Sequence, residues 1–217
     1  MRVITLAEHT EYDTERLIRR IPFFNDVYEH SAIEFQALVS LSDIMIAEPG
    51  EIVIRKGEND MYLYFLLKGQ LNVYLDDDPA SPSVNSISPG EVFGILSMMT
   101  RTPRSAFIRA DQKAKKTLLF RLDYGHMTDS SDHSKLSLPV KLIFYRMAIH
   151  NIRWMLEMNK MSDPKHYLVE KIRRLPLVNV QKGTKAELEA LKQQAQSLSD
   201  ILFEWNSSKG KPAAEKK

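Results

Sequence analysis

Short hydrophobic runs separated by turn residues dominate the chain between residues 43 and 123. The runs are rich in β-branched, aliphatic and aromatic residues, and five of the eight glycines in the sequence lie among them. Short strands at this spacing predict an all-β roll, barrel or jelly roll of roughly eight strands. The glycines indicate tight turns and close backbone approaches; they are Gly50, Gly57, Gly69, Gly90 and Gly94.

Before this region, apolar residues at helical spacing predict two short helices. The first ends at Pro22-Phe23-Phe24, where the proline interrupts the pattern. The second runs from about Ile33 to Leu41. Both helices would pack through their apolar faces on the structure that follows.

After this region, the polar stretch from Asp123 to Lys135 leads into a long helix predicted over Leu138 to Met161. Its apolar positions repeat by three and four, as in a coiled coil, and the stripe is wider than one core contact requires. One face would cover the roll and another would pair with a second copy of the chain. The pattern therefore predicts a homodimer.

Two further helices are predicted before the C-terminus. Asp163-Pro164 has the residue types of an N-cap and a first helical position, and a short helix beginning there would end at Pro176. Thr184 and Glu187 have the spacing of a capping box, which begins a helix that runs to Trp205. The polar tail from Asn206 to Lys217 is expected to be disordered.

The amino-acid composition excludes several classes of function but says little about the fold. With 43% hydrophobic and 27% charged residues, the 217-residue chain has the make-up of an ordinary globular protein. It contains no cysteine, which excludes disulfides, thiolate catalysis and cysteine-ligated zinc, and suits a reducing cytoplasm. A net charge of +2 is too small to indicate a nucleic-acid partner. No apolar stretch approaches the roughly 20 residues of a membrane span.

The segment from Gly90 to Ala106 contains the residues that point to a ligand site. Its opening Gly-Glu-x-Phe-Gly marks a strand end that turns sharply, and a helical turn from Ile95 onward would present unpaired backbone N–H groups to an anion. Arg104 has the planar fork of donors that suits phosphate, and Ser105 adds a hydroxyl. The segment predicts a phosphate-binding loop; the alternative is a structural arginine paired with a nearby carboxylate. The candidate ligand contacts are Gly94, Ile95, Leu96, Arg104 and Ser105.

This segment resembles the phosphate-binding cassette of cyclic nucleotide-binding domains, above all over Arg104 to Ala110 and in the spacing from Gly94 to Arg104. Upstream, the glycine-punctuated strands around Gly57-Glu58 and Lys68-Gly69-Gln70 resemble the same family. The resemblance covers about residues 15 to 160. It implies a mainly β fold with flanking α: a cyclic-nucleotide-binding-like β-roll of the double-stranded jelly-roll type, followed by long C-terminal helices.

Two features depart from the family pattern. Relatives carry Glu directly after the cassette glycine, where its carboxylate holds the ribose 2′-hydroxyl, and here that residue is Ile95. Loss of one charged hydrogen bond weakens binding by roughly 10- to 150-fold, so low affinity for cAMP and cGMP is expected. The activator-type relatives also carry a winged helix-turn-helix after the long helix, and no such pattern follows here, so DNA binding is not expected.

These observations predict a cytoplasmic, non-enzymatic sensor or adaptor with no catalytic residues, metal site or cofactor. Its ligand would be a phosphate-bearing nucleotide, either a cyclic nucleotide or a cyclic dinucleotide, bound weakly or in a non-standard way. The signal would pass through the C-terminal helices to a protein partner. Two alternatives stay open: a ligand-free structural adaptor with a degenerate pocket, and a transcription regulator with an unrecognised DNA-binding segment.

The expected organisation has five parts. They are N-terminal helices over 1–42, the β-roll over 43–135, a long dimerisation-type helix over 136–162, a C-terminal helical extension over 163–206 and a disordered tail over 207–217.

Overall fold

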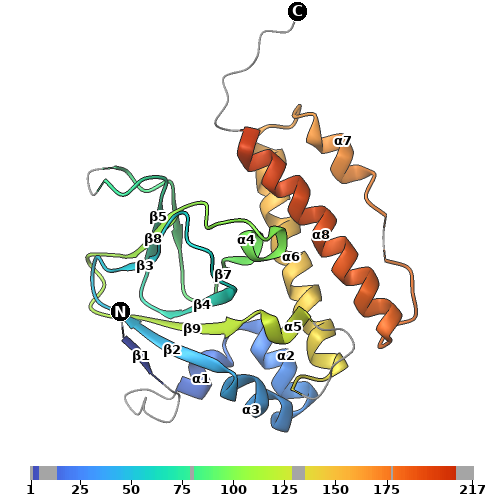
Figure 1. Ribbon diagram of the computed structural model, residues 1–217, viewed down its shortest axis with the longest axis horizontal. Helices are drawn as coiled ribbons and strands as arrows, with labels where there is room; N and C mark the ends of the chain where they lie inside the picture. Colours follow the sequence, from blue (N-terminus) through green and yellow to red (C-terminus); the bar gives the residue numbers. More distant parts are fainter. Residues whose placement is uncertain (1, 5–13, 79–80, 129–134, 177, 209–217) are drawn as a thin grey trace, which may run out of the picture.

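The computed structural model describes residues 2–4, 14–78, 81–128, 135–176 and 178–208. Within them, a β-roll lies on one side and a group of long helices on the other, with short helices beneath the roll (Figure 1). The described strands make two antiparallel sheets. The first has the order β1 (Arg2–Ile4), β2 (Ser42–Ala47), β9 (Thr117–Asp123), β4 (Tyr62–Lys68) and β7 (Val92–Phe93); the second has the order β3 (Ile52–Ile54), β8 (Phe107–Ala110), β5 (Leu71–Tyr74) and β6 (Asn85–Ile87).

The eight strands from β2 to β9, with one short helix among them, confirm the predicted roll. That short helix is α4 (Ile95–Thr100), which follows β7 directly. The other helices are α1 (Thr14–Ile18), α2 (Pro22–His30), α3 (Ala32–Ser40), α5 (Gly125–Thr128), α6 (Leu138–Ser162), α7 (Leu168–Arg173) and α8 (Lys185–Ser208).

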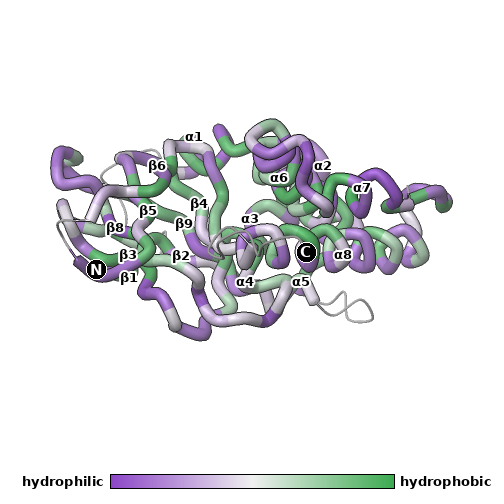
Figure 2. The backbone as a smooth tube through the Cα atoms, turned by 90° about the horizontal axis from the view of Figure 1, so that it is seen from above, coloured by the Kyte–Doolittle hydropathy of each residue, from purple (hydrophilic) through white to green (hydrophobic). Residues whose placement is uncertain are grey.

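Alternation along β4 divides the hydrophobic core into two parts. Leu63, Phe65 and Leu67 belong to a large cluster shared with the helices, whereas Tyr64 and Leu66 belong to a smaller cluster between the two sheets. Successive side chains of a strand point to opposite faces, so a strand covered on both faces is apolar throughout. This explains why β4 appears in the sequence as one continuous hydrophobic run. In Figure 2 the strands carry long hydrophobic stretches, whereas the loops at the outer end of the roll are mostly hydrophilic.

The C-terminal helices largely follow the sequence pattern. The predicted long helix is α6, and the heptad positions of α8 from Leu188 to Trp205 are buried, mainly against α6. The capping box is also present. The Thr184 hydroxyl accepts a hydrogen bond from the Glu187 N–H at 3.2 Å, while the Glu187 carboxylate accepts one from the Gly183 N–H at 2.6 Å.

Four local predictions are wrong. The first predicted helix does end before Pro22, but three helices precede the roll where two were predicted. The extra one is α2, which begins at Pro22 because a proline is well accommodated in the first turn of a helix and the following Phe23 and Phe24 are buried. The helix expected from Asp163 begins only at Leu168, because the His166 ring stacks on Trp205 with 4.2 Å between ring centroids and holds the chain in a turn.

The third wrong prediction concerns the tail, which was expected to be disordered from Asn206 onward. Helix α8 continues through Asn206 to Ser208. The rest of the expected tail lies outside the described residues. The stretch expected to be loop-like before α6 contains α5. None of the described helices combines the length and apolar character that crossing a membrane requires.

Candidate ligand-binding site

A pocket of about 630 Å³ opens between the roll and the C-terminal helices. Its roll side comes from β3, β5, β6 and the segment from Glu91 to Ala106, and its other side comes from α6 and α8. The five residues predicted from the sequence all line this one pocket. The helical side adds Asn151, Trp154, Met155, Met158 and Asn159 from α6, and Leu202 and Asn206 from α8.

The floor of the pocket is the turn from β7 into α4. Gly94 caps α4 with a φ of 90°, in the left-handed region that favours glycine. A Cβ atom at Gly94 would lie 2.5 Å from the Nη1 atom of Arg104 and 3.3 Å from the carbonyl oxygen of Tyr62. This position therefore requires glycine both for its backbone conformation and for the close approach of the arginine.

Arg104 is buried, with 4% of its surface exposed, and lies against the backbone of Gly94. Its Nη1 atom donates to the Gly94 carbonyl at 2.9 Å and to the Ser97 hydroxyl at 2.8 Å. Its Nε atom donates to Oδ2 of Asp60 at 3.1 Å, and Nη2 donates to Oδ1 of the same carboxylate and to the carbonyl of Tyr62 at 2.6 Å. The guanidinium is thus held by a carboxylate and by three further acceptors.

The Asp60 carboxylate bears on an alternative that the sequence left open, in which Arg104 pairs with a nearby carboxylate. Ile95 stands where relatives carry Glu, so no acidic residue follows the cassette glycine. Asp60 lies outside the cassette, in the loop between β3 and β4, and supplies that charge across 44 positions of the sequence. Oδ1 of Asp60 also accepts a hydrogen bond from the Tyr62 N–H at 3.0 Å, which fixes the carboxylate at the start of β4. Arg104 is therefore paired with a carboxylate in this structure, as the structural alternative describes.

The β3–β4 loop also holds the backbone of Arg104. The Arg104 N–H donates to the Glu58 carbonyl at 2.8 Å, and the Gly57 N–H donates to the Arg104 carbonyl at 2.8 Å. Behind the ion pair, Tyr64 stacks on Phe93 with 5.3 Å between ring centroids. Burial, together with the nearby Asp60 carboxylate, raises the pKa of Tyr64 to about 12. The arginine end of the pocket is consequently a packed and internally bonded unit.

Ile95 and Ser105, two other predicted ligand contacts, differ in how deeply they are buried. Ile95 is buried and belongs to the same hydrophobic cluster as the helices, so it forms a wall between pocket and core. Ser105 is exposed at the pocket edge. Two residues that the sequence argument missed, Asp60 and Ser97, bind Arg104 through their side chains. A local signal existed only for Ser97, which lies inside the cassette.

The cassette helix is joined to the C-terminal helix. Helix α4 packs mainly on α8 and also contacts α6. Its buried residues Ile95, Met98 and Met99 share a hydrophobic cluster with Leu198 and Leu202 of α8. On the other side of α4, the Tyr124 hydroxyl contacts the Met99 sulfur at 3.3 Å and the Tyr145 hydroxyl of α6 at 3.2 Å. One element thus lines the pocket and packs against both long helices.

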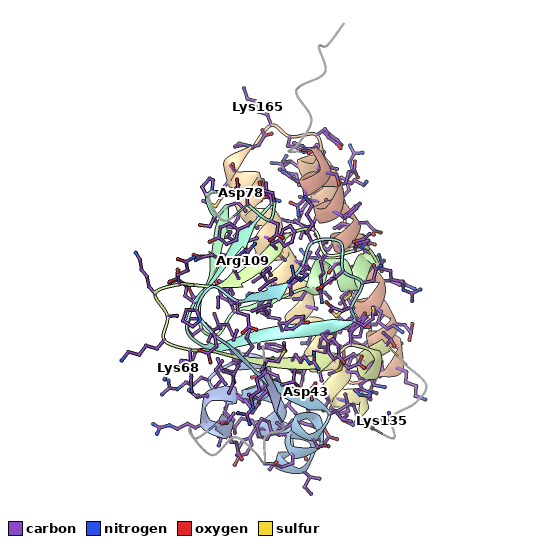
Figure 3. All side chains as sticks on the ribbon, turned by 60° about the vertical axis from the view of Figure 1, so that its left-hand side comes forward. Asp43, Lys68, Asp78, Arg109, Lys135 and Lys165 are labelled. Carbon is purple, nitrogen blue, oxygen red and sulfur yellow. The ribbon has the colours of Figure 1, made fainter. Side chains whose placement is uncertain are left out.

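A second Arg–Asp pair of the roll provides a contrast to Arg104. Arg109 of β8 pairs with Asp77 in the turn between β5 and β6, near Asp78 in Figure 3. The Asp77 side chain is 56% exposed, as expected for a solvated hairpin tip. Both arginines belong to the stretch that carries the family resemblance, yet only Arg104 lines the pocket.

Comparison with known proteins matches residues 45–129 to the model of the cyclic nucleotide-binding domain. The chain is 29% identical over 97 residues to a cAMP-dependent protein kinase type II regulatory subunit from Drosophila melanogaster, covering 44% of this chain and 25% of that protein. It is 25% identical over 116 residues to a cyclic nucleotide-gated potassium channel from Rhizobium etli, covering 54% of this chain and 30% of the channel.

Among solved structures, the chain is similar to the sensor domain of the transcriptional regulator DNR from Pseudomonas aeruginosa. The TM-score is 0.46 and the identity 21%, over 75% of this chain and 99% of that domain. The chain therefore spans less than a third of the two sequence relatives, and nearly the whole of the sensor domain.

Proposed function

We propose, from the membership of residues 45–129 in the cyclic nucleotide-binding domain family, that this chain is a non-enzymatic signalling sensor. Its ligand binds in the pocket between the roll and the C-terminal helices, and α8 relays the occupied state to a protein partner. One observation carries the proposal: the roll, α6 and α8 all line this pocket, so a ligand in it would contact all three.

The α4–α8 contact supports a relay. A ligand can shift an equilibrium only through contacts that differ between two states. Here Ile95 and Leu202 line the pocket from opposite sides and belong to one hydrophobic cluster, so a ligand that moves one changes the packing of the other. Packed interiors transmit such shifts because they are close to crystalline density.

Weak binding of ordinary cyclic mononucleotides is part of the proposal. Ile95 offers no acceptor to a ribose hydroxyl, and the Arg104 donors already have acceptors within the chain. The phosphate of a cyclic nucleotide would have to displace one of these hydrogen bonds before it could bind the Arg104 guanidinium. This is also the observation that favours the second candidate function, a ligand-free adaptor that has kept the fold.

We further propose that α6 pairs with a second copy of the chain. Trp154, Met158 and Met161 occur at helical spacing and are 63%, 46% and 71% exposed. Large apolar side chains gathered on one exposed stripe are typical of interaction surfaces. Met161 lies outside the ligand pocket, so Met161→Lys should convert a dimer to a monomer in light scattering while leaving the pocket intact. A wild type that is monomeric at high micromolar concentration would contradict the dimer.

The sensor proposal is tested by screening and hydrogen exchange on the full chain. The panel contains cyclic mononucleotides, cyclic dinucleotides and their parent nucleosides at millimolar concentration, scored by thermal shift. A compound that stabilises the chain should slow amide exchange in α4 and in α8. Slowing confined to the roll would contradict the relay but keep the binding site. A panel without any stabilising compound would favour the adaptor.

A further inference from the structure

The donors of Arg104 can be counted, and none is left over. A guanidinium carries five N–H donors. Two go to Asp60, one to the Tyr62 carbonyl, one to the Gly94 carbonyl and one to the Ser97 hydroxyl. The positive charge is neutralised by the Asp60 carboxylate. Arg104 therefore offers a phosphate neither a free donor nor an uncompensated charge.

No other cation lines the pocket. Among its lining residues, which all lie in the described part of the chain, only Arg104 and Glu91 are charged. Glu91 is acidic and brings no positive charge; its Oε2 atom accepts the Ser88 N–H at 2.7 Å. An anion buried without a counter-charge pays a large desolvation penalty. The pocket is therefore electrostatically unfavourable for the group that its family resemblance suggests.

The rest of the lining suits an uncharged ligand. Isoleucine, valine and methionine side chains provide apolar walls, and Trp154 of α6 presents a largely exposed ring at the mouth. Asparagine amides among the lining residues match the edges of a neutral heterocycle. The Asn85 Oδ1 accepts the Ser86 N–H and one Asn151 Nδ2 proton goes to the Met147 carbonyl, each at 2.9 Å, so Asn85 offers its Nδ2 donors and Asn151 its Oδ1 acceptor. Asn206 of α8 lines the pocket as well. A volume of about 630 Å³ lies within the range of small-molecule sites.

We propose that this pocket binds an uncharged, planar aromatic compound with hydrogen-bonding edges and discriminates against the same compound carrying a phosphate. The inference rests on the proposed function, in that the pocket between roll and helices is the ligand site. It adds the chemical class of the ligand and reverses the preference expected from the cassette. Stacking of the ring on Trp154 places the ligand between the roll and α6.

The test is calorimetry on the full chain with two matched pairs, adenosine with cAMP and guanosine with cGMP. At least one nucleoside should bind ten times or more tightly than its cyclic phosphate. A cyclic phosphate that binds more tightly than its nucleoside in either pair would overturn the inference while leaving the sensor proposal standing. If no member of either pair binds at millimolar concentration, the inference is overturned and the adaptor gains support.

Two variants locate the discrimination. Ser97→Ala frees one Arg104 donor without touching the Asp60 carboxylate, so cAMP should bind about tenfold or more tightly than to wild type. Ser197→Ala removes a hydroxyl of α8 that lies outside the pocket and bonds only within its own helix, and should change neither affinity. An unchanged cAMP affinity in Ser97→Ala would contradict the donor argument.

Trp154→Ala should weaken nucleoside binding about tenfold, because base stacking on an aromatic side chain contributes on the order of 1–3 kcal/mol. Trp154→Phe should retain most of the affinity. Met161→Ala, on the same exposed stripe but outside the pocket, separates this effect from any change in dimerisation. Unchanged nucleoside affinity in Trp154→Ala would show that the ligand does not lie against α6.

Discussion

The two sides of the pocket are built in opposite ways. On the roll side, Arg104 is 4% exposed, and each of its donors has an acceptor within the chain. On the helical side, Trp154 and Met158 are about half exposed or more, and α6 presents them to open space. The roll side holds its shape without a ligand, whereas the helical side gains buried surface only when something covers it. The cassette arginine is thus fully bonded within the chain, whereas the helical side of the pocket carries exposed apolar side chains.

The largest effect should come from breaking the roll side. Asp60→Ala removes the carboxylate from a buried guanidinium, and loss of one partner of a buried pair costs about 3–5 kcal/mol. Urea denaturation measures the loss. Asp77→Ala is the matched control, because its pair with Arg109 is exposed and should contribute at most about 1 kcal/mol. Equal effects of the two substitutions would contradict a special role for the buried pair.

The close approach of Arg104 to Gly94 gives the next effect. Gly94→Ala places a side chain in the left-handed region and 2.5 Å from Nη1 of Arg104. Backbone strain of this kind costs about 1–3 kcal/mol, and the clash should put the loss at the upper end of that range. Gly57 has a similar φ of 88°, but a Cβ atom added there would meet nothing within 4 Å. Gly57→Ala therefore measures the cost of backbone strain without a clash. A loss no larger at Gly94 than at Gly57, in the same denaturation assay, would show that the arginine yields easily.

The start of α8 gives a smaller effect that depends on pH. Partial burial alone would raise the pKa of Glu187, but hydrogen bonds from Arg146 and the Gly183 N–H lower it below its usual range. The unfolded chain therefore binds this proton at higher pH than the folded chain does, so stability falls as the pH drops from about 5 through the lowered pKa.

Glu187→Gln should remove that part of the acid dependence and lower stability by about 1 kcal/mol at neutral pH, since the cap is weakened. Chemical denaturation at a series of pH values measures both changes. Glu189→Gln, on the exposed face of the same helix, should leave the pH profile unchanged. A profile that responds equally to both substitutions would assign the acid dependence to other carboxylates.

The smallest effect on stability should come from the helical side of the pocket. Trp154→Ala removes a side chain that is 63% exposed, so the free energy of unfolding should change by about 0.5 kcal/mol or less. Denaturation below the concentration of dimer formation measures this separately from assembly. A loss above about 2 kcal/mol would mean that Trp154 supports the core, and the contrast between the two sides would fail.

The sequence predicted most of this architecture, because its signals are local. Strand runs, the seam of α6 and the capping box at Thr184 each depend on residues a few positions apart. The start of α7 was missed because the stacking of His166 on Trp205 joins positions 39 residues apart. The partner of Arg104 was missed for the same reason, since Asp60 lies in a loop that reaches the cassette only in the folded roll. Sequence spacing brought together five residues that line one pocket, whereas the hydrogen bonds that occupy Arg104 depend on contacts that only folding creates.

The state of the Arg104 guanidinium in solution tests the central claim most directly. Nitrogen-15 NMR of the full chain resolves the Nη protons of an arginine when its side chain is held by hydrogen bonds. We expect separate, slowly exchanging Arg104 signals in the ligand-free chain, and expect them to stay in place when cAMP is added to millimolar concentration. Averaged signals that shift and sharpen on addition of cAMP would show that the donors are free for phosphate, and would contradict the assignment of Arg104 to the structure of the roll.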